Sequence, residues 1–143
     1  MVAYAAAKGK GDARVAAVVD FYGAHDLLRL VEERDKGDFS SVALALLQQR
    51  TVDETTKWKL REASPLEYVH RKMPPVLFIH GTQDQAVPFN QSPLMCDAMK
   101  KVKASCEVFP VEGGVHGMSN WEKNPAHQAY KGKMIEWLNL TLK

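Results

Sequence analysis

The sequence predicts an α/β protein with a mostly parallel sheet, folded as one domain. Three runs rich in β-branched and aromatic residues alternate with segments of helical periodicity. This alternation is typical of parallel strands joined by crossover helices. The length of 143 residues suits one domain, and 45% hydrophobic with 25% charged residues suits a globular chain. Since no repeat or flexible linker divides the sequence, we expect residues 1–143 to form a single domain.

The first half of the chain predicts one strand and a long helical segment. Residues 2–8 are rich in alanine and indicate the end of a helix. Residues 15–22 form an apolar run that predicts a strand buried on both faces. Residues 24–63 are mostly helical in pattern, with a capping box at residues 51–54 and a stop at Pro65. Because this segment is long for a simple crossover, we interpret it as a helical insert.

The second half predicts two further strands and two helices. The strands are residues 76–79 and 106–109. Between them, Ser92 and Pro93 predict the start of a helix. The apolar residues expected to pack this helix on the sheet are Leu94, Ala98 and Val102. A closing helix is expected after Asn124-Pro125, with a buried face made of Tyr130, Met134, Ile135, Leu138 and Leu142.

Charge and composition exclude several classes of partner. The 19 Lys and Arg residues against 17 Asp and Glu give a net charge of +2, too small to predict binding to nucleic acid or an anionic membrane. No apolar run approaches the roughly 20 residues that span a bilayer, and no targeting signal is evident. We therefore expect a soluble chain whose compartment the sequence leaves open. Cys96 and Cys106 are expected to be small buried apolar residues, with no disulfide, metal or cofactor.

Two polar residues follow neighbouring strands of the predicted sheet. Asp84 lies in the segment His80-Gly-Thr-Gln-Asp-Gln-Ala-Val-Pro88, and His116 lies between Gly114 and Gly117 after the last strand. Because parallel strands deliver their carboxyl ends to one edge, we expect these two side chains to meet there. A carboxylate that accepts the Nδ1 proton of an imidazole orients the ring, so that its other nitrogen serves as a general base.

Together these segments resemble the C-terminal half of an α/β-hydrolase, in the esterase/lipase and prolyl-oligopeptidase-like branch. In that family, H-G-x-x-D-x-x-V-P precedes a histidine flanked by glycines, and the catalytic order is Ser, Asp, His. The resemblance implies that Asp84 is the acid and His116 the base. It also implies an incomplete sheet, with about the last three strands of the family and their flanking helices.

The nucleophile of that family is missing from the sequence. No G-x-S-x-G occurs in the 143 residues, and none of the six serines lies in a strand-turn-helix elbow. We therefore expect a fragment of a serine hydrolase acting on small carboxylic esters, with the serine lying upstream and little turnover by the isolated chain. Residues 24–63 would form a small lid. The alternative is a non-catalytic binding or assembly module on the same truncated fold.

Other residues carry weaker expectations. Trp121 is the candidate for the wall of a substrate pocket, whereas Trp137 is expected in the core. Asp26 is expected to cap a helix rather than to enter the site. The other histidines are expected on the surface or around the site: His25, His70, His80 and His127. Without the missing strands, the first strand would expose an unpaired edge, and we expect self-association into a homodimer through it.

Overall fold

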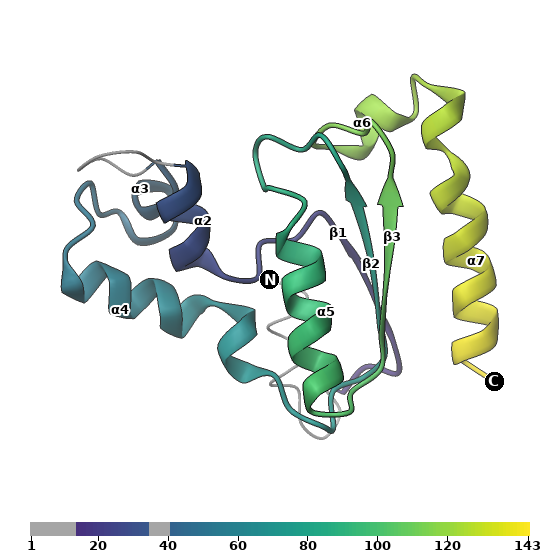
Figure 1. Cartoon of the computed structure of the whole chain (residues 1–143), viewed down its shortest axis with the longest axis horizontal. Coiled ribbons are helices and arrows are strands. Elements are labelled where there is room, and N and C mark those ends of the chain that lie inside the picture. The colour runs from purple at the N-terminus through teal and green to yellow at the C-terminus, as the bar shows by residue number, and fades with distance from the viewer. Residues whose placement is uncertain (1–13, 35–40) are drawn as a thin grey trace.

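Three parallel strands form the sheet in the computed structural model, which describes residues 14–34 and 41–143 (Figure 1). The strands are β1 (Val18–Phe21), β2 (Val76–Gly81) and β3 (Cys106–Val111), in the spatial order β1-β2-β3. This confirms the α/β class and the parallel arrangement. β1 is shorter than predicted because its pairing with β2 begins at Val18, and Val15 is exposed. The helix expected at residues 2–8 lies outside the described residues.

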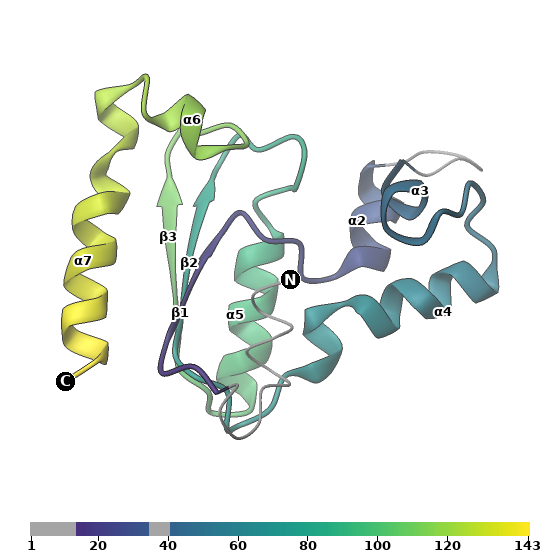
Figure 2. The same cartoon turned by 180° about the vertical axis from the view of Figure 1, so that it is seen from behind.

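Helices cover both faces of the sheet, so β2 is buried along its whole length (Figures 1 and 2). Helix α5 (Gln91–Lys101) packs on one face, over Val76 and Phe78. Helices α6 (Met118–Trp121) and α7 (Ala129–Thr141) cover the other face, where Leu77 and Ile79 point. Successive side chains of β2 therefore point to opposite faces of the sheet, and each face packs against its own layer of helices.

Helix α5 begins two residues earlier than the sequence predicts. Its first residue is Gln91, and Ser92 lies inside the helix instead of capping it. Its buried apolar residues are Met95, Cys96 and Met99, whereas Leu94 and Ala98 are only half-buried. Gln91 is itself buried, and its Oε1 accepts hydrogen bonds from the backbone N–H groups of His25 and Asp26, at 2.9 and 2.8 Å, so this residue belongs to the inward face of α5.

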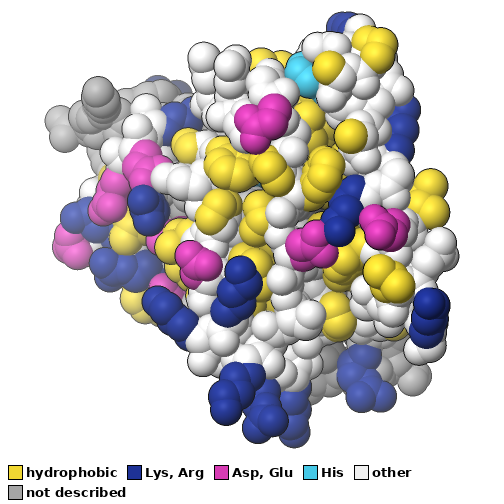
Figure 3. Space-filling view, turned by 45° about the vertical axis from the view of Figure 1, so that its right-hand side comes forward, with side chains coloured by type: hydrophobic (Ala, Val, Ile, Leu, Met, Phe, Trp, Pro, Cys, Tyr) yellow, Lys and Arg dark blue, Asp and Glu magenta, His cyan; other side chains and the backbone are white. Residues whose placement is uncertain are grey.

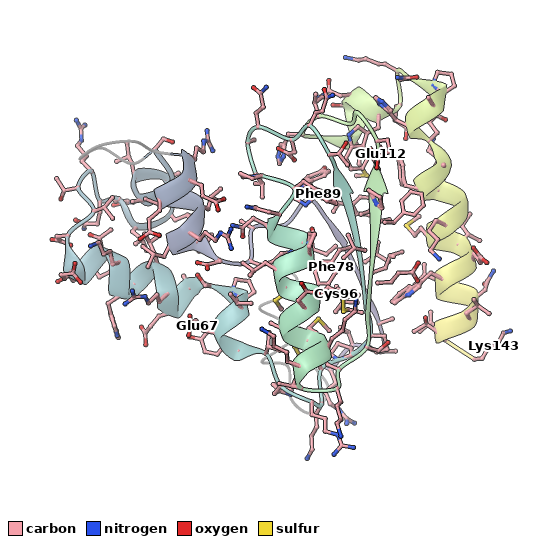
Figure 4. The ribbon with its side chains drawn as sticks, viewed as in Figure 1. Glu67, Phe78, Phe89, Cys96, Glu112 and Lys143 are labelled. Atoms are coloured by element: carbon pink, nitrogen blue, oxygen red, sulfur yellow. A yellow bond between two sulfur atoms is a disulfide. The ribbon has the colours of Figure 1, made fainter. Side chains whose placement is uncertain are left out.

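The two cysteines form a disulfide, so the prediction of two buried thiols was wrong. Cys96 of α5 and Cys106 at the start of β3 have their sulfur atoms 2.08 Å apart (Figure 4). The bond joins a helix to the strand that the helix covers. Spacing along the chain did not reveal the pair, because its formation depends on how α5 packs against β3.

Residues 24–34 and 41–63 form a helical unit beside the sheet (Figure 1). It contains α2 (Leu27–Arg34), α3 (Ser41–Leu47) and α4 (Glu54–Ala63), and the short helix η2 (Pro65–Tyr68) follows. These helices enclose an apolar cluster of their own, made of Leu27, Leu28, Leu30, Val31, Val42 and Leu60. The helical character predicted for this part of the chain therefore agrees with α2, α3 and α4.

The caps of these helices agree with the sequence in part. Asp26 accepts a hydrogen bond from the Arg29 backbone N–H at 2.9 Å, which confirms its capping role. Helix α4 is capped by Asp53, whose Oδ1 accepts from the Thr56 N–H at 2.7 Å. The capping box expected from Thr51 is therefore wrong, because Asp53 places a stronger acceptor next to the first turn.

The closing helix begins as predicted but buries a different face. Asn124 caps the short helix η3 (Pro125–His127), and α7 follows. Tyr130 and Trp137 are buried, as expected, whereas Ile135 and Leu142 are more than half exposed. On this side of the molecule, exposed hydrophobic side chains lie among charged ones (Figure 3).

Among the described residues, no helix combines the length and the apolar composition that crossing a bilayer requires.

Candidate active site

Asp84 and His116 lie in contact at the carboxyl edge of the sheet. Asp84 is in the turn that follows β2, and His116 is in the loop that follows β3. The His116 Nδ1 atom is 2.7 Å from Asp84 Oδ2, which is a strong hydrogen-bond distance. The sequence predicted this meeting because β2 and β3 are neighbouring parallel strands.

Two glycines allow the loops after β2 and β3 to approach each other closely. A Cβ atom on Gly81 would lie 2.2 Å from the carbonyl oxygen of Gly114, so neither loop could keep its path. The loops are also joined by hydrogen bonds, from the Gln83 N–H to Gly114 O and from the Gly113 N–H to Thr82 Oγ1. Gly81 thus serves the site through its lack of a side chain.

The carboxyl group of Asp84 is fully buried and fixed in direction. Its Oδ1 atom accepts hydrogen bonds from the backbone N–H groups of Ala86 and Val87, at 2.9 and 2.8 Å. Oδ2 is thereby turned toward His116. A carboxylate held by its own loop in this way can orient an imidazole without moving itself.

The ring of His116 is partly open to solvent, with 40% of its side chain exposed. Tyr22, the residue after β1, contacts the ring with centroids 4.6 Å apart. Tyr22 has a φ of 45°, in the left-handed region that non-glycine residues seldom adopt, and this conformation presents its ring to His116. Tyr22 was not predictable as a site residue, since nothing in the sequence of a tyrosine at a strand end signals a positive φ.

An apolar cavity of about 510 Å³ opens beside His116. It lies between the helical unit and the loop that carries Asp84. Most of its lining is aliphatic, and its lining residues include Ala24, Leu27, Leu30, Val42, Leu46, Pro65, Val87 and His116. The arrangement places an imidazole nitrogen next to a space suited to an apolar group.

Trp121 does not line this cavity. Its side chain is fully buried in the layer beneath α7, where its Nε1–H donates to Val115 O and its ring contacts Tyr22. Trp121 therefore packs against Tyr22, which in turn contacts His116. Trp137 lies in the same buried layer, as the sequence predicted.

Two of the remaining histidines, His80 and His25, are buried. His80 is fully buried, with Nε2 3.4 Å from Asp84 Oδ2, so it lies around the site as expected. His25 is also fully buried but contacts Asp20 and Phe78 instead, which corrects the expectation of a surface or site residue. Within residues 14–34 and 41–143, no three His, Cys, Asp or Glu side chains gather as a metal ion would require.

Comparisons with known proteins give a consistent relationship. A family model described as BD-FAE matches residues 1–99. Esterase LipC of Mycobacterium tuberculosis is 33% identical over 110 residues, which are 74% of this chain and 26% of that protein. Isoprenylcysteine alpha-carbonyl methylesterase ICME of Arabidopsis thaliana is 25% identical over 96 residues, 66% of this chain and 22% of that protein. The chain spans about a quarter of the length of these curated relatives.

Solved structures agree in fold. A truncated carbohydrate esterase from gut microbiota superimposes with a TM-score of 0.78 and 23% identity, over 97% of this chain and 54% of that one. A thermophilic esterase from Thermogutta terrifontis gives a TM-score of 0.61 and 27% identity, over 88% of this chain and 42% of that one. The three strands and their helices therefore occur together in longer chains.

Proposed function

The chain belongs to the BD-FAE family and shares the fold of α/β-hydrolase esterases, and from this premise we propose that it carries the acid and the base of a carboxylic ester hydrolase. Asp84 is the acid and His116 the base. The observation that carries the proposal is the 2.7 Å contact between His116 Nδ1 and Asp84 Oδ2, at the edge where parallel sheets hold their sites.

The chemistry follows from the protons of this pair. With Nδ1–H donated to Asp84, the Nε2 atom of His116 carries the lone pair and takes the proton of an attacking hydroxyl. The buried carboxylate stabilises the imidazolium that results, and Nε2 then returns the proton to the departing alcohol. The hydroxyl belongs to a serine outside these 143 residues, which contain no G-x-S-x-G.

The substrate in this proposal is a small carboxylic ester with an apolar acyl or alcohol group. The aliphatic cavity beside His116 would take that group. The helices α2 to α4 supply much of the cavity lining and would act as a lid over the bound ester. The esterase names of the relatives support this substrate class.

Reactivity toward a fluorophosphonate probe tests this proposal. The isolated chain is expected to remain unlabelled, whereas a reading frame extended upstream to include a G-x-S-x-G serine is expected to react. In that longer protein, Asp84→Asn and His116→Ala should each lower kcat/KM for an aryl acetate by roughly 10³-fold or more.

Matched controls are Asp97→Asn, an exposed carboxyl on α5, and His70→Gln, both expected to leave kcat/KM unchanged. Labelling of any serine within the 143 residues, or full activity after Asp84→Asn, would contradict the proposal. A longer protein that carries the serine and still fails to react would instead favour a non-catalytic binding or assembly module.

The outer edge of β1 suggests that the chain associates with a second copy of itself. Among the described residues, β1 pairs with β2 alone. The N–H groups of Val18 and Tyr22 donate to β2, so those of Val19 and Phe21 point to the other side. Unpaired groups along an apolar strand favour pairing with another strand, and two copies related by a two-fold axis would satisfy them.

A further inference from the structure

A second imidazole lies directly behind the Asp84 and His116 pair. His80, near the end of β2, is completely buried. Its Nε2 atom is 2.9 Å from the carbonyl oxygen of Val87, and its Nδ1 atom is 2.7 Å from the Ser92 hydroxyl. Phe89, which lies just before α5 (Figure 4), packs against the ring with centroids 5.7 Å apart. Every polar atom of this buried ring therefore has a partner.

These partners fix which nitrogen of His80 carries the proton. A carbonyl oxygen can only accept a hydrogen bond, so Nε2 must carry the hydrogen that is shared with Val87. In a neutral ring Nδ1 is then an acceptor, and the Ser92 hydroxyl must donate to it. The Val87 carbonyl thus fixes the tautomer of His80, and Ser92, in the first turn of α5, completes the hydrogen bonding of the ring.

Charge around the ring favours the neutral form. Burial lowers the pKa of His80, although the hydrogen bond to Val87 and the nearby charge of Asp84 act in the opposite direction. The other titratable groups that face it are His116, from the loop after β3, and His25, from the connection after β1. A positive charge on either one further disfavours a charged His80.

The contacts of His80 continue into the carboxyl group of Asp84. The peptide unit before Val87 donates its N–H to Asp84 Oδ1 at 2.8 Å, while the Val87 carbonyl accepts from His80. His80 Nε2 also lies 3.4 Å from Oδ2, the oxygen that His116 uses. His80 therefore holds the loop that orients both oxygens of the carboxyl group.

We propose that His80 is a positioning residue for the acid–base pair: the Val87 carbonyl holds it as the Nε2–H tautomer, Ser92 donates to its Nδ1, and by holding Val87 it keeps Asp84 aimed at His116. This inference rests on the proposed function, since it assigns His80 a task within the same site. The role needs no proton transfer to or from His80 at any step.

Nitrogen-15 NMR of the histidine rings tests the proposal on the 143-residue chain itself. In the unaltered chain, His80 is expected to show hydrogen on Nε2 and none on Nδ1 from pH 5 to pH 8. His116 is expected to show a hydrogen-bonded Nδ1–H that exchanges slowly with water.

Two substitutions of His80 separate positioning from packing. Gln places a terminal amide nitrogen at the same number of bonds from Cα as Nε2, so His80→Gln should preserve the slow exchange of the His116 Nδ1–H. His80→Leu keeps an apolar body but has no donor, and should accelerate that exchange by about tenfold, the value of one lost hydrogen bond. Ser92→Ala removes the donor to Nδ1 but leaves the Val87 carbonyl in place, so His80 should keep its hydrogen on Nε2, as it should after Ser105→Ala at an exposed serine.

Several results would overturn the inference. They are a His80 ring that carries hydrogen on Nδ1, or on both nitrogens, at pH 7, and a folded His80→Leu chain in which the His116 exchange rate is unchanged. If His80→Leu fails to fold, the unaltered chain and Ser92→Ala decide the question through the tautomer of His80. Loss of the His116 Nδ1–H signal in the unaltered chain contradicts the proposed function, whereas its presence beside a mobile His80 tautomer contradicts this inference alone.

Discussion

His25 is a fully buried imidazole that the site does not use. Neither of its ring nitrogens has a hydrogen-bond partner within the described part of the chain, and its ring packs edge-on against Phe78. Burial lowers the pKa of His25 to about 3. The folded chain therefore keeps His25 neutral at pH values where the unfolded chain, with a pKa near 6.5, takes up a proton.

This difference makes stability depend on pH. The contribution of neutral His25 is fully present above the unfolded pKa of 6.5, and it is lost as the pH falls toward 3. Between pH 7 and pH 5, we expect the unaltered chain to lose roughly 2 kcal/mol more unfolding free energy than His25→Leu. Urea unfolding at the two pH values measures this, with His70→Leu as the exposed control. Parallel losses in the unaltered chain and His25→Leu would show that His25 titrates normally.

Gly81 sets the separation between the two loops of the site. Because an added Cβ would lie 2.2 Å from Gly114 O, Gly81→Ala must push the loops apart. We expect it to cost about 1–3 kcal/mol of unfolding free energy, as overpacking does. The matched control is Gly132→Ala on α7, where no atom lies within 4 Å of the new Cβ; it should stabilise the helix by about 0.5–1 kcal/mol. Equal stability of the two variants in urea unfolding would mean that the loops yield without cost.

At the scale of the elements, the disulfide ties α5 to the strand beneath it. Cys96 and Cys106 are separated by ten residues in the chain. A disulfide that closes a loop of this length stabilises the folded chain by about 3 kcal/mol, because it lowers the conformational entropy of the unfolded chain. We expect dithiothreitol to lower the unfolding free energy by up to that amount, and the double variant Cys96→Ala with Cys106→Ala to be insensitive to reductant. Detection of two free thiols by mass spectrometry in the non-reduced chain would contradict the bond.

The strands were predictable from their runs of apolar and β-branched residues, although β2 and β3 continue two residues past the predicted ends, to Gly81 and Val111. Strand β2 shows such a run, and every residue from Val76 to Gly81 is buried. The inward face of α7 was less predictable, because Ile135 and Tyr130 are both apolar and only the angle of packing decides between them. The inward face of α5 was also less predictable. It includes Gln91, whose hydrogen bonds reach a segment about 65 residues away in the chain.

The candidate site was predictable where it depends on topology alone. Asp84 and His116 meet because consecutive parallel strands end at one edge. The contacts of Tyr22 and His80 were not predictable, because each depends on a local backbone conformation or a buried partner that the sequence pattern does not encode. The pairing of the site residues thus follows from the order of elements, whereas their supports follow from packing.

For the whole molecule, the proposed self-association depends on the outer edge of β1. We expect light scattering to show a dimer whose fraction rises with concentration. Val19→Pro removes one outward N–H without touching the bonds to β2, and should shift the chain toward monomer. Val19→Thr keeps that N–H and should behave as the unaltered chain. A monomer at all concentrations, or an undiminished dimer after Val19→Pro, would contradict pairing through this edge.

The separate apolar cluster of helices α2 to α4 has a further consequence. Leu28, Val31 and Leu60 bury one another and not the strands, so the helical unit can open as a cooperative block while the sheet remains folded. Such partial opening would widen the cavity beside His116 without disturbing the contact to Asp84. The helical unit would therefore control whether a bulky ligand can enter, whereas the loops after β2 and β3 would keep the hydrogen bond between His116 and Asp84.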